Sequence, residues 1–373
     1  MKEKILHVLK TETVLVVATF LALVSLFFNP PSKEYVDFID FRVLGILLAL
    51  MFVMAGYQLN GVFAKLGGKL IAKCNTTLKL SFVLVFLCFF SSMLLTNDVA
   101  LITFVPFALL TLRMGRKDSL IIPVVVFQTI AANLGSMLTP MGNPQNLYLY
   151  GLSGMDIGEF IMLMLPYTLV SAMILVICIF AVIKRESIDA GFVDDEGNEC
   201  VARKSHIIIY SALFILCILT VIRFVEWYIV TLIVMGVVLI IDRRVFKKAD
   251  YSLLLTFIAF FIFIGNMGEI EVVNNMLSSL IEGRELLVSV VSSQVVSNVP
   301  AAILLSGFTD NYEALIIGTN LGGLGTLIAS MASLISYKQV TGKYKEYTGK
   351  YFISFTVYNI MFLAILAVFA YIY

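Results

Sequence analysis

Polar residues that could bind ions interrupt two long apolar segments of the chain. Thr96-Asn97-Asp98 lies within the apolar run 78–112, and Ser297-Asn298 lies within the run 286–308. Irregular backbone at membrane depth is tolerated only inside protein or beside a water-filled cavity, because unpaired backbone groups are costly in lipid. We therefore interpret each site as the tip of a helical hairpin whose carbonyls and side-chain amide can bind an ion. The simpler alternative is that Thr96 and Ser297 act only as helix N-caps.

Asp98 is the one acidic residue deep within a predicted membrane segment. Intramembrane carboxylates are costly and usually mark ion or proton pathways. We therefore predict that Asp98 is the coupling residue for Na⁺ or H⁺. The alternative is a shallow tip at which the carboxylate reaches water.

A third motif extends from Asn133 to Asn146 and is dense in helix breakers and amides. Proline lacks a backbone N–H and clashes within a helix, so this stretch predicts a helix broken at mid-membrane. The freed half-helix ends offer carbonyls to a cation and N–H groups to an anion. A simple kink would not require so many amides. The predicted substrate ligands are Thr139, Pro140, Gly142, Asn143, Pro144 and Asn146, and Asn133 and Gly135 are predicted to bind the coupling ion.

The second half of the chain has a counterpart with fewer amides and more hydroxyls, from Asn320 to Ser333. Its glycines could instead permit close helix packing. The predicted substrate ligands here are Thr326 and Ser330, together with Thr96, Asn97, Ser297 and Asn298 at the tips. The predicted ligands of the coupling ion are Asn320 and Gly322, together with Asn97, Asp98 and Asn298.

The composition indicates an all-α polytopic membrane protein. Of 373 residues, 60% are hydrophobic and 14% are charged, against about 25% charged in soluble domains. A net charge of +1 gives no support for nucleic-acid binding. Two histidines and five cysteines without a CxxC pair give no metal cluster or disulfide framework. No Walker motif or catalytic constellation is present, so we expect neither direct ATP coupling nor an enzyme.

The distribution of basic residues predicts the topology, because cytoplasmic loops are enriched in Lys and Arg. The basic loops 60–79, 113–118, 242–250 and 338–350 are assigned to the inside, and 29–40, 151–159, 269–285 and 308–313 to the outside. This assignment requires 78–112 and 286–308 to leave and re-enter on one side, as hairpins or, less favoured, as pairs of short spans. Nine full crossings then remain, with the N-terminus cytoplasmic and the C-terminus outside.

The motifs of the two halves can be aligned. Asn133-Leu134-Gly135 matches Asn320-Leu321-Gly322, and each triplet follows a hairpin. The span 206–222 lies between the halves and would invert the second one, which is an architecture of secondary transporters. We predict a first repeat over 1–183, a cytoplasmic loop and linking span over 184–222, and a second repeat over 223–373.

With these motifs the chain resembles the ion transporter superfamily, which includes divalent-anion/sodium symporters, citrate permeases, arsenite permeases and D-type sodium/proton antiporters. The resemblance implies hairpin tips that bind sodium and substrate carboxylates. It also implies unwound helices with a Thr-Pro and a Pro-Asn pattern, as at Thr139-Pro140 and Asn143-Pro144. Asp98 and Val299 replace the hydroxyl residue of the dicarboxylate members, and an Asn-Asp tip is more similar to the arsenite permease branch. By the same resemblance, a homodimer is implied.

We therefore expect a secondary active transporter of a small anion in the plasma membrane, coupled to Na⁺ or H⁺. A sodium/proton antiporter or an anion channel of the same fold is the alternative. No cofactor is expected, apart from Na⁺ as a coupling ion. The tips and breaks contain no Lys or Arg, so helix N-termini, amides, hydroxyls and a co-bound cation must hold the anion.

Overall fold

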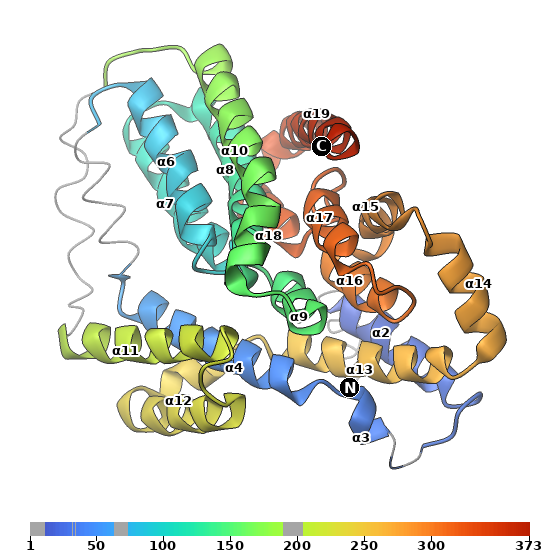
Figure 1. Cartoon of the computed structure of the whole chain (residues 1–373). Helices are drawn as coiled ribbons and strands as arrows, with labels where there is room; N and C mark the ends of the chain where they lie inside the picture. The colour runs from blue at the N-terminus through green and yellow to red at the C-terminus, as the bar shows by residue number, and fades with distance from the viewer. Residues whose placement is uncertain (1–11, 32, 34, 63–73, 189–203) are drawn as a thin grey trace.

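The computed structural model describes residues 12–31, 33, 35–62, 74–188 and 204–373, and within these ranges it is built from helices without a strand. The order of elements is easily followed in Figure 1. The first part of the chain forms α2 (Thr13–Ser25), α3 (Tyr35–Phe38), α4 (Phe41–Leu59), α6 (Thr77–Ser92), α7 (Asn97–Met114), η1 (Asp118–Leu120), α8 (Ile121–Gly135), η2 (Ser136–Leu138), η3 (Pro140–Gly142), α9 (Pro144–Ser153) and α10 (Ile157–Val182).

The second part repeats much of this order after one additional helix. It forms α11 (Lys204–Val221), α12 (Trp227–Ile241), η5 (Arg243–Lys247), α13 (Tyr251–Gly268), α14 (Glu271–Ile281), α15 (Glu285–Val296), α16 (Asn298–Ser306), α17 (Tyr312–Gly322), α18 (Met331–Lys343), η6 (Lys345–Tyr347) and α19 (Thr348–Ile372). The predicted interruptions at Asn97 and Asn298 are confirmed as the starts of α7 and α16. The predicted helix breaks lie between α8 and α9 and between α17 and α18.

The helices suit a membrane. Seven of the described helices are long and apolar enough to cross one, and α2, α6, α12 and α15 are shorter apolar helices. Six of the seven coincide with predicted crossings, and the seventh is the hairpin arm α7. The other three predicted crossings are the short helices α2 and α12 and the broken pair α17–α18, so the count of nine stays a prediction.

The first hairpin begins and ends at the same end of the molecule. The Thr77 hydroxyl, at the start of α6, donates to the Lys184 carbonyl at 2.6 Å. Lys117, just after α7, forms an ion pair with Glu186, and this hydrogen bond and charge lower the pKa of the Glu186 carboxyl. The tip lies at the break before α9, and α9 continues for 10 residues, or about 15 Å. This arrangement favours a re-entrant hairpin.

The helices form two groups, which Figure 1 shows as differently oriented sets of ribbons. One group contains α2, α4, α11, α12 and α13, and the other contains the hairpins, the broken helices, α10 and α19. In the first group, α2 packs against α13 and α4 packs against α12. In the second, α7 packs against α18 and α16 packs against α9. The motif-bearing elements therefore share one group and meet the other mainly at α4 and α13.

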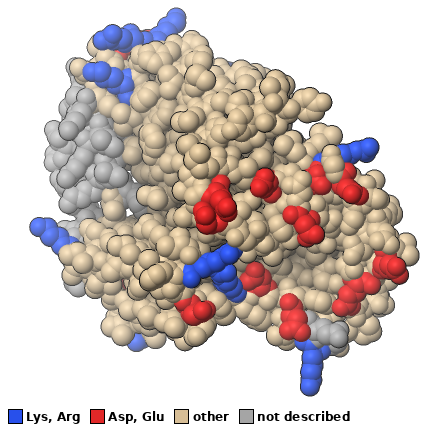
Figure 2. Space-filling model, in the orientation of Figure 1, with Lys and Arg blue, Asp and Glu red and all other residues tan. Residues whose placement is uncertain are grey.

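Much of the surface is apolar. Figure 2 shows broad areas free of charge, with Lys and Arg gathered above α6 and α10 and Asp and Glu frequent around α13 and α14. Met162, Leu169, Met173, Ile177 and Phe180 are all exposed along α10. Contiguous exposed apolar surface of this kind indicates contact with lipid. The charge distribution agrees with the predicted sidedness, although the assignment of faces to cytoplasm and outside stays a prediction.

Two connections differ from the sequence-based expectation. The stretch 269–285 contains the helix α14, and 338–350 is largely helical, since α18 extends to Lys343 and α19 begins at Thr348. In α14, Val273 and Leu277 are partly buried whereas Val272, Met276 and Leu280 are exposed. Because α14 also contains polar residues, its sequence does not resemble a continuous apolar span. The predicted basic residues Lys65, Lys69 and Lys73 lie outside the described residues.

Candidate functional site

The two hairpin tips have the same local hydrogen bond. The Asn97 side-chain oxygen accepts from the Asp98 backbone N–H at 2.9 Å, and the Asn298 oxygen accepts from the Val299 N–H at 3.0 Å. Thr96 and Ser297 occupy the N-cap positions of α7 and α16, but neither side chain makes the capping hydrogen bond. Ser297 has φ of 76°, a strained conformation of the kind found at functional turns.

Asn133 links the first tip to the second half of the chain. Its side-chain oxygen accepts from Asn97 at 2.9 Å and from the Ser330 hydroxyl at 3.0 Å. Its amide nitrogen donates to the Ser333 hydroxyl at 3.3 Å and to the Gly323 carbonyl at 3.5 Å. These groups are almost fully buried. One side chain thus joins a hairpin tip to the opposite helix break.

Asn320 makes the corresponding links in the other direction. Its amide nitrogen donates to the Asn146 side-chain oxygen at 2.6 Å, and its oxygen accepts from Asn143 at 3.5 Å. Asn143 also donates to the Ser136 hydroxyl at 2.7 Å. We call Asn97, Asn133, Asn143, Asn146 and Asn320 the amide cluster.

The positions in these contacts are reciprocal. Gly135 and Gly322 are aligned in the two halves of the chain. Relative to these glycines, Asn143 corresponds to Ser330, and Asn146 corresponds to Ser333. Asn133 hydrogen-bonds to Ser330 and Ser333 in the second half. Asn320 hydrogen-bonds to the corresponding residues of the first half, Asn143 and Asn146. Reciprocal contacts of this type are expected of two halves related by a two-fold axis.

The breaks also attach to the hairpin arms at matching places. The Thr139 hydroxyl donates to the Met93 carbonyl, and the Thr326 hydroxyl donates to the Gln294 carbonyl at 3.2 Å. Met93 and Gln294 each precede the tip asparagine by four residues. Thr326 is exposed and is held away from the amide cluster, so the structure does not bring this predicted ligand to the others.

Gly135 and Gly322 serve close packing. A Cβ atom on Gly135 would overlap the Phe89 carbonyl and the Ser92 hydroxyl, and one on Gly322 would overlap Ser293. These arm residues again occupy corresponding positions. Gly142 similarly approaches the Ser136 carbonyl. Close helix packing therefore explains Gly322, and it explains Gly135 equally well. Pro140 and Pro144 have a different role, because they begin the short helices η3 and α9.

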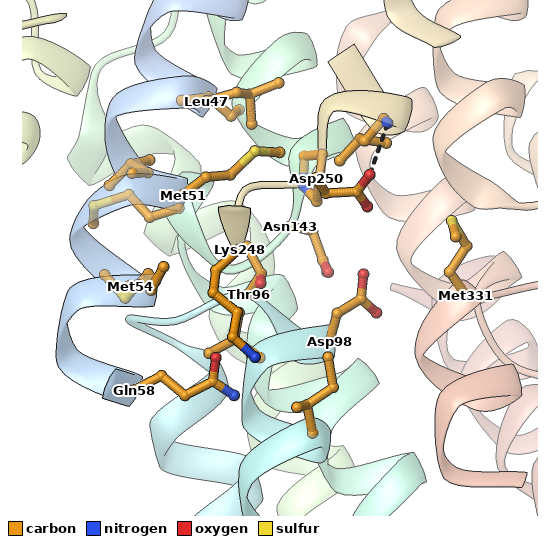
Figure 3. Close-up of a pocket in the computed structure, with 18 of the residues that line it drawn as sticks. Leu47, Met51, Met54, Gln58, Thr96, Asp98, Asn143, Lys248, Asp250 and Met331 are labelled. Carbon is orange, nitrogen blue, oxygen red and sulfur yellow. Dashed lines mark hydrogen bonds between the residues drawn. The ribbon is translucent and has the colours of Figure 1, made fainter. Parts of the chain in front are cut away.

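A cavity of about 170 Å³ adjoins the first tip, and Figure 3 shows its lining. Thr96, Asp98 and Asn143 contribute from the tip and the break. The facing wall comes from α4, with the apolar Leu47, Met51 and Met54 and the polar Gln58. A second cavity of about 160 Å³ adjoins Ser297 and Val299 at the other tip. Both cavities are lined by Asp250, Leu253, Met331 and Ile335, which places them next to each other.

Three helices begin at residues that line the first cavity. These are α7 near Asp98, α9 at Pro144 and α18 at Met331. Helix N-termini carry partial positive charge and unpaired N–H groups, so they favour an anion. The polar residues of the lining offer hydroxyl and amide groups, two carboxylates and one ammonium group. An anion in this cavity would contact helix N-termini, hydroxyls and amides, and no basic residue of the tips or breaks.

Sequence reasoning missed two charged residues of this cavity. Lys248 and Asp250 lie between η5 and α13 and line the cavity opposite Asp98. The sequence presents them only as part of a basic loop that indicates the topology. The N-cap position of Asp250 before an apolar helix was visible in the sequence, but its proximity to Asp98 depends on the packing of α13.

Comparison with known proteins identifies relatives of this chain. Residues 5–313 match the family model described as citrate transporter. The chain is 37% identical over 251 residues to an uncharacterized transporter of Methanocaldococcus jannaschii, a match that covers 66% of each protein. It is 32% identical over 312 residues to the inner membrane protein YbiR of Escherichia coli, covering 81% of this chain and 80% of that protein. A shorter match, 31% identical over 147 residues, is to a silicon efflux transporter of Oryza sativa subsp. japonica, covering 38% of this chain and 30% of that protein.

Proposed function

Because the chain belongs to the citrate transporter family and is a multi-pass membrane protein, we propose that it is a secondary active transporter of a small anion. The anion is a carboxylate or an inorganic oxyanion, and Na⁺ or H⁺ drives its movement across the plasma membrane. The family and the relatives that carry functional names are transporters, not enzymes. The observation that carries the anion is the cavity at which α7, α9 and α18 begin.

The mechanism that we propose is alternating access around the amide cluster. The hairpins and breaks are connected to one another by hydrogen bonds, so they would move as one unit against the group that contains α4 and α13. The reciprocal contacts of Asn133 and Asn320 support an internal two-fold relation of the halves. In an inverted repeat such a relation exchanges an inward-open state for an outward-open one.

Within the site, we assign the anion to the helix N-termini and the Thr96 hydroxyl. Asp98 is assigned to the coupling ion, because a bare carboxylate would repel the anion unless it were neutralised. Anion binding should then depend on the cation. A homodimer remains part of the proposal through the family resemblance.

Counterflow in proteoliposomes tests the transporter. Vesicles loaded with one unlabelled anion should accumulate the same labelled anion by exchange. Citrate, as the family name suggests, and phosphate, sulfate and arsenite form the panel, each with Na⁺ or choline. Conductance without obligatory exchange would instead identify a channel. Exchange of Na⁺ for H⁺ with no anion present would identify the antiporter.

A further inference from the structure

We propose that Asp250 completes, with Asp98 and Asn143, a binding site for one Na⁺ ion between the first hairpin and α13. This inference rests on the proposed function and deepens it, because it adds a residue outside both hairpins and both breaks to the coupling-ion site.

Two buried oxygen atoms of the site lack hydrogen-bond partners. The Asp98 Oδ1 and Asn143 Oδ1 atoms are buried and accept no hydrogen bond from the described chain, and Asn143 is only 2% exposed. Figure 3 shows the carboxylates of Asp98 and Asp250 directed toward each other, with the Asn143 side chain ending beside them. Carboxylate and amide oxygens are the ligands that hard cations prefer.

Asp250 contributes an oxygen without giving up its structural role. Its Oδ1 accepts from the Leu253 backbone N–H at 3.0 Å and from the Ser252 hydroxyl at 2.9 Å, which caps α13. The second carboxylate oxygen is left for a ligand. Three oxygen donors therefore come from three different elements.

The charges around the cavity favour a monovalent ion. Among the described lining residues, Asp98, Asp250 and Lys248 are the charged ones. With both carboxylates ionised, one negative charge remains uncompensated, and two facing carboxylates repel each other. Asp250 also lines the neighbouring cavity, where Glu12 and Lys338 offset each other. One Na⁺ ion therefore neutralises the site.

The position of Asp250 has a mechanical consequence. Asp250 belongs to the group of α2, α4 and α13, whereas Asp98 and Asn143 belong to the hairpin group. A cation at this site binds both groups and is released when they separate. Na⁺ occupancy should therefore stabilise the conformation described here by mass action.

The test uses the full-length protein purified in detergent, with thermal unfolding followed as NaCl replaces choline chloride at constant ionic strength. Asp250→Asn retains the N-cap, because Asn caps helices as well as Asp does, but it removes the charge. We expect the Na⁺ concentration for half-maximal stabilisation to rise at least tenfold. Asp250→Ser, also an N-cap residue, is the second variant.

Asp40→Asn is the matched control. Asp40 caps α4 through Val43 at 2.9 Å and lines neither cavity, so its Na⁺ dependence should equal that of the wild type. The inference is overturned if the wild type responds to pH but not to Na⁺, or if both Asp250 variants retain the wild-type Na⁺ dependence. Counterflow by the wild type is measured separately, and its absence would overturn the proposed function whatever the Na⁺ titration shows.

Discussion

Asparagine is used at the tips and breaks because it donates and accepts at once. Asn97 donates to Asn133 and accepts from the backbone of its own helix, so both ends of the amide are occupied in the absence of ligand. Asn143, by contrast, has an oxygen without a partner. Buried polar groups that lack partners are costly, so the Asn143 and Asp98 oxygens are available to a ligand at the cavity that both residues line.

Asn97→Ala should abolish transport while the protein still folds. The substitution removes one of the two hydrogen bonds that the Asn133 side-chain oxygen accepts, a loss of about 0.5–1.5 kcal/mol. Counterflow activity and the unfolding temperature are the measurements. Asn359→Ala is the control, because Asn359 is also buried but bonds only to Phe355 within α19. Similar activity in both variants would mean that the tip is purely structural.

Asp98→Asn should remove the dependence of transport on Na⁺ or pH before it removes anion binding. The physical reason is that the amide keeps the shape of the side chain but cannot hold a cation by charge. Anion exchange by the variant, measured with and without Na⁺ over a range of pH, gives the answer. Unchanged cation dependence would place the coupling ion elsewhere.

At the scale of elements, the hairpins and broken helices depend on close contact. The glycines at the ends of α8 and α17 let each helix touch a hairpin arm. The amides then connect the breaks to each other across the halves. The site is therefore held by packing between elements that are far apart in the sequence.

Gly135→Ala should destabilise the protein by about 1–3 kcal/mol, the usual cost of overpacking a core, and should lower transport. Gly236→Ala in α12 is the control, since a Cβ atom there meets nothing within 4 Å. That variant should be neutral or more stable by about 0.5–1 kcal/mol, because alanine favours the helix. The unfolding temperature should therefore fall in Gly135→Ala and stay unchanged or rise in Gly236→Ala.

For the whole molecule, contacts between connections agree with two separate faces. Arg113 bonds to the Tyr344 hydroxyl at 3.2 Å, which joins two connections assigned to the inside. Asn29 donates to Glu269, which joins two assigned to the outside. Arg223 donates to the Tyr150 carbonyl at 3.3 Å, beside the connection that follows α9. None of these three hydrogen bonds joins a connection assigned to the inside to one assigned to the outside.

A cysteine at Arg116 should be labelled only from the cytoplasmic side, and one at Asp310 only from the outside. Both native residues are exposed, and a background without the native cysteines makes the labelling specific. An impermeant maleimide applied to intact cells and to inverted vesicles distinguishes the sides. Labelling of both positions from the same side would contradict the topology and the inverted repeat.

The sequence by itself determined the class of protein, the hairpin interruptions and the helix breaks. Apolar runs of span length, prolines and glycines act locally, so Pro140, Pro144 and the Asn97 tip could be placed without tertiary information. The repeat motif also identified Asn133 and Asn320 as matching residues. These predictions depend on backbone hydrogen bonding in lipid, which each segment must satisfy for itself.

Only the tertiary structure decided what these residues contact. The crossed bonds of Asn133 and Asn320, the exposed position of Thr326 and the packing role of Gly135 follow from how the two halves meet. Asp250 and Lys248 reach the cavity because α13 packs beside α4 and α16. Long-range packing of this kind depends on the summed fit of many side chains, and a charged loop residue carries no local sign of the carboxylate that it will face.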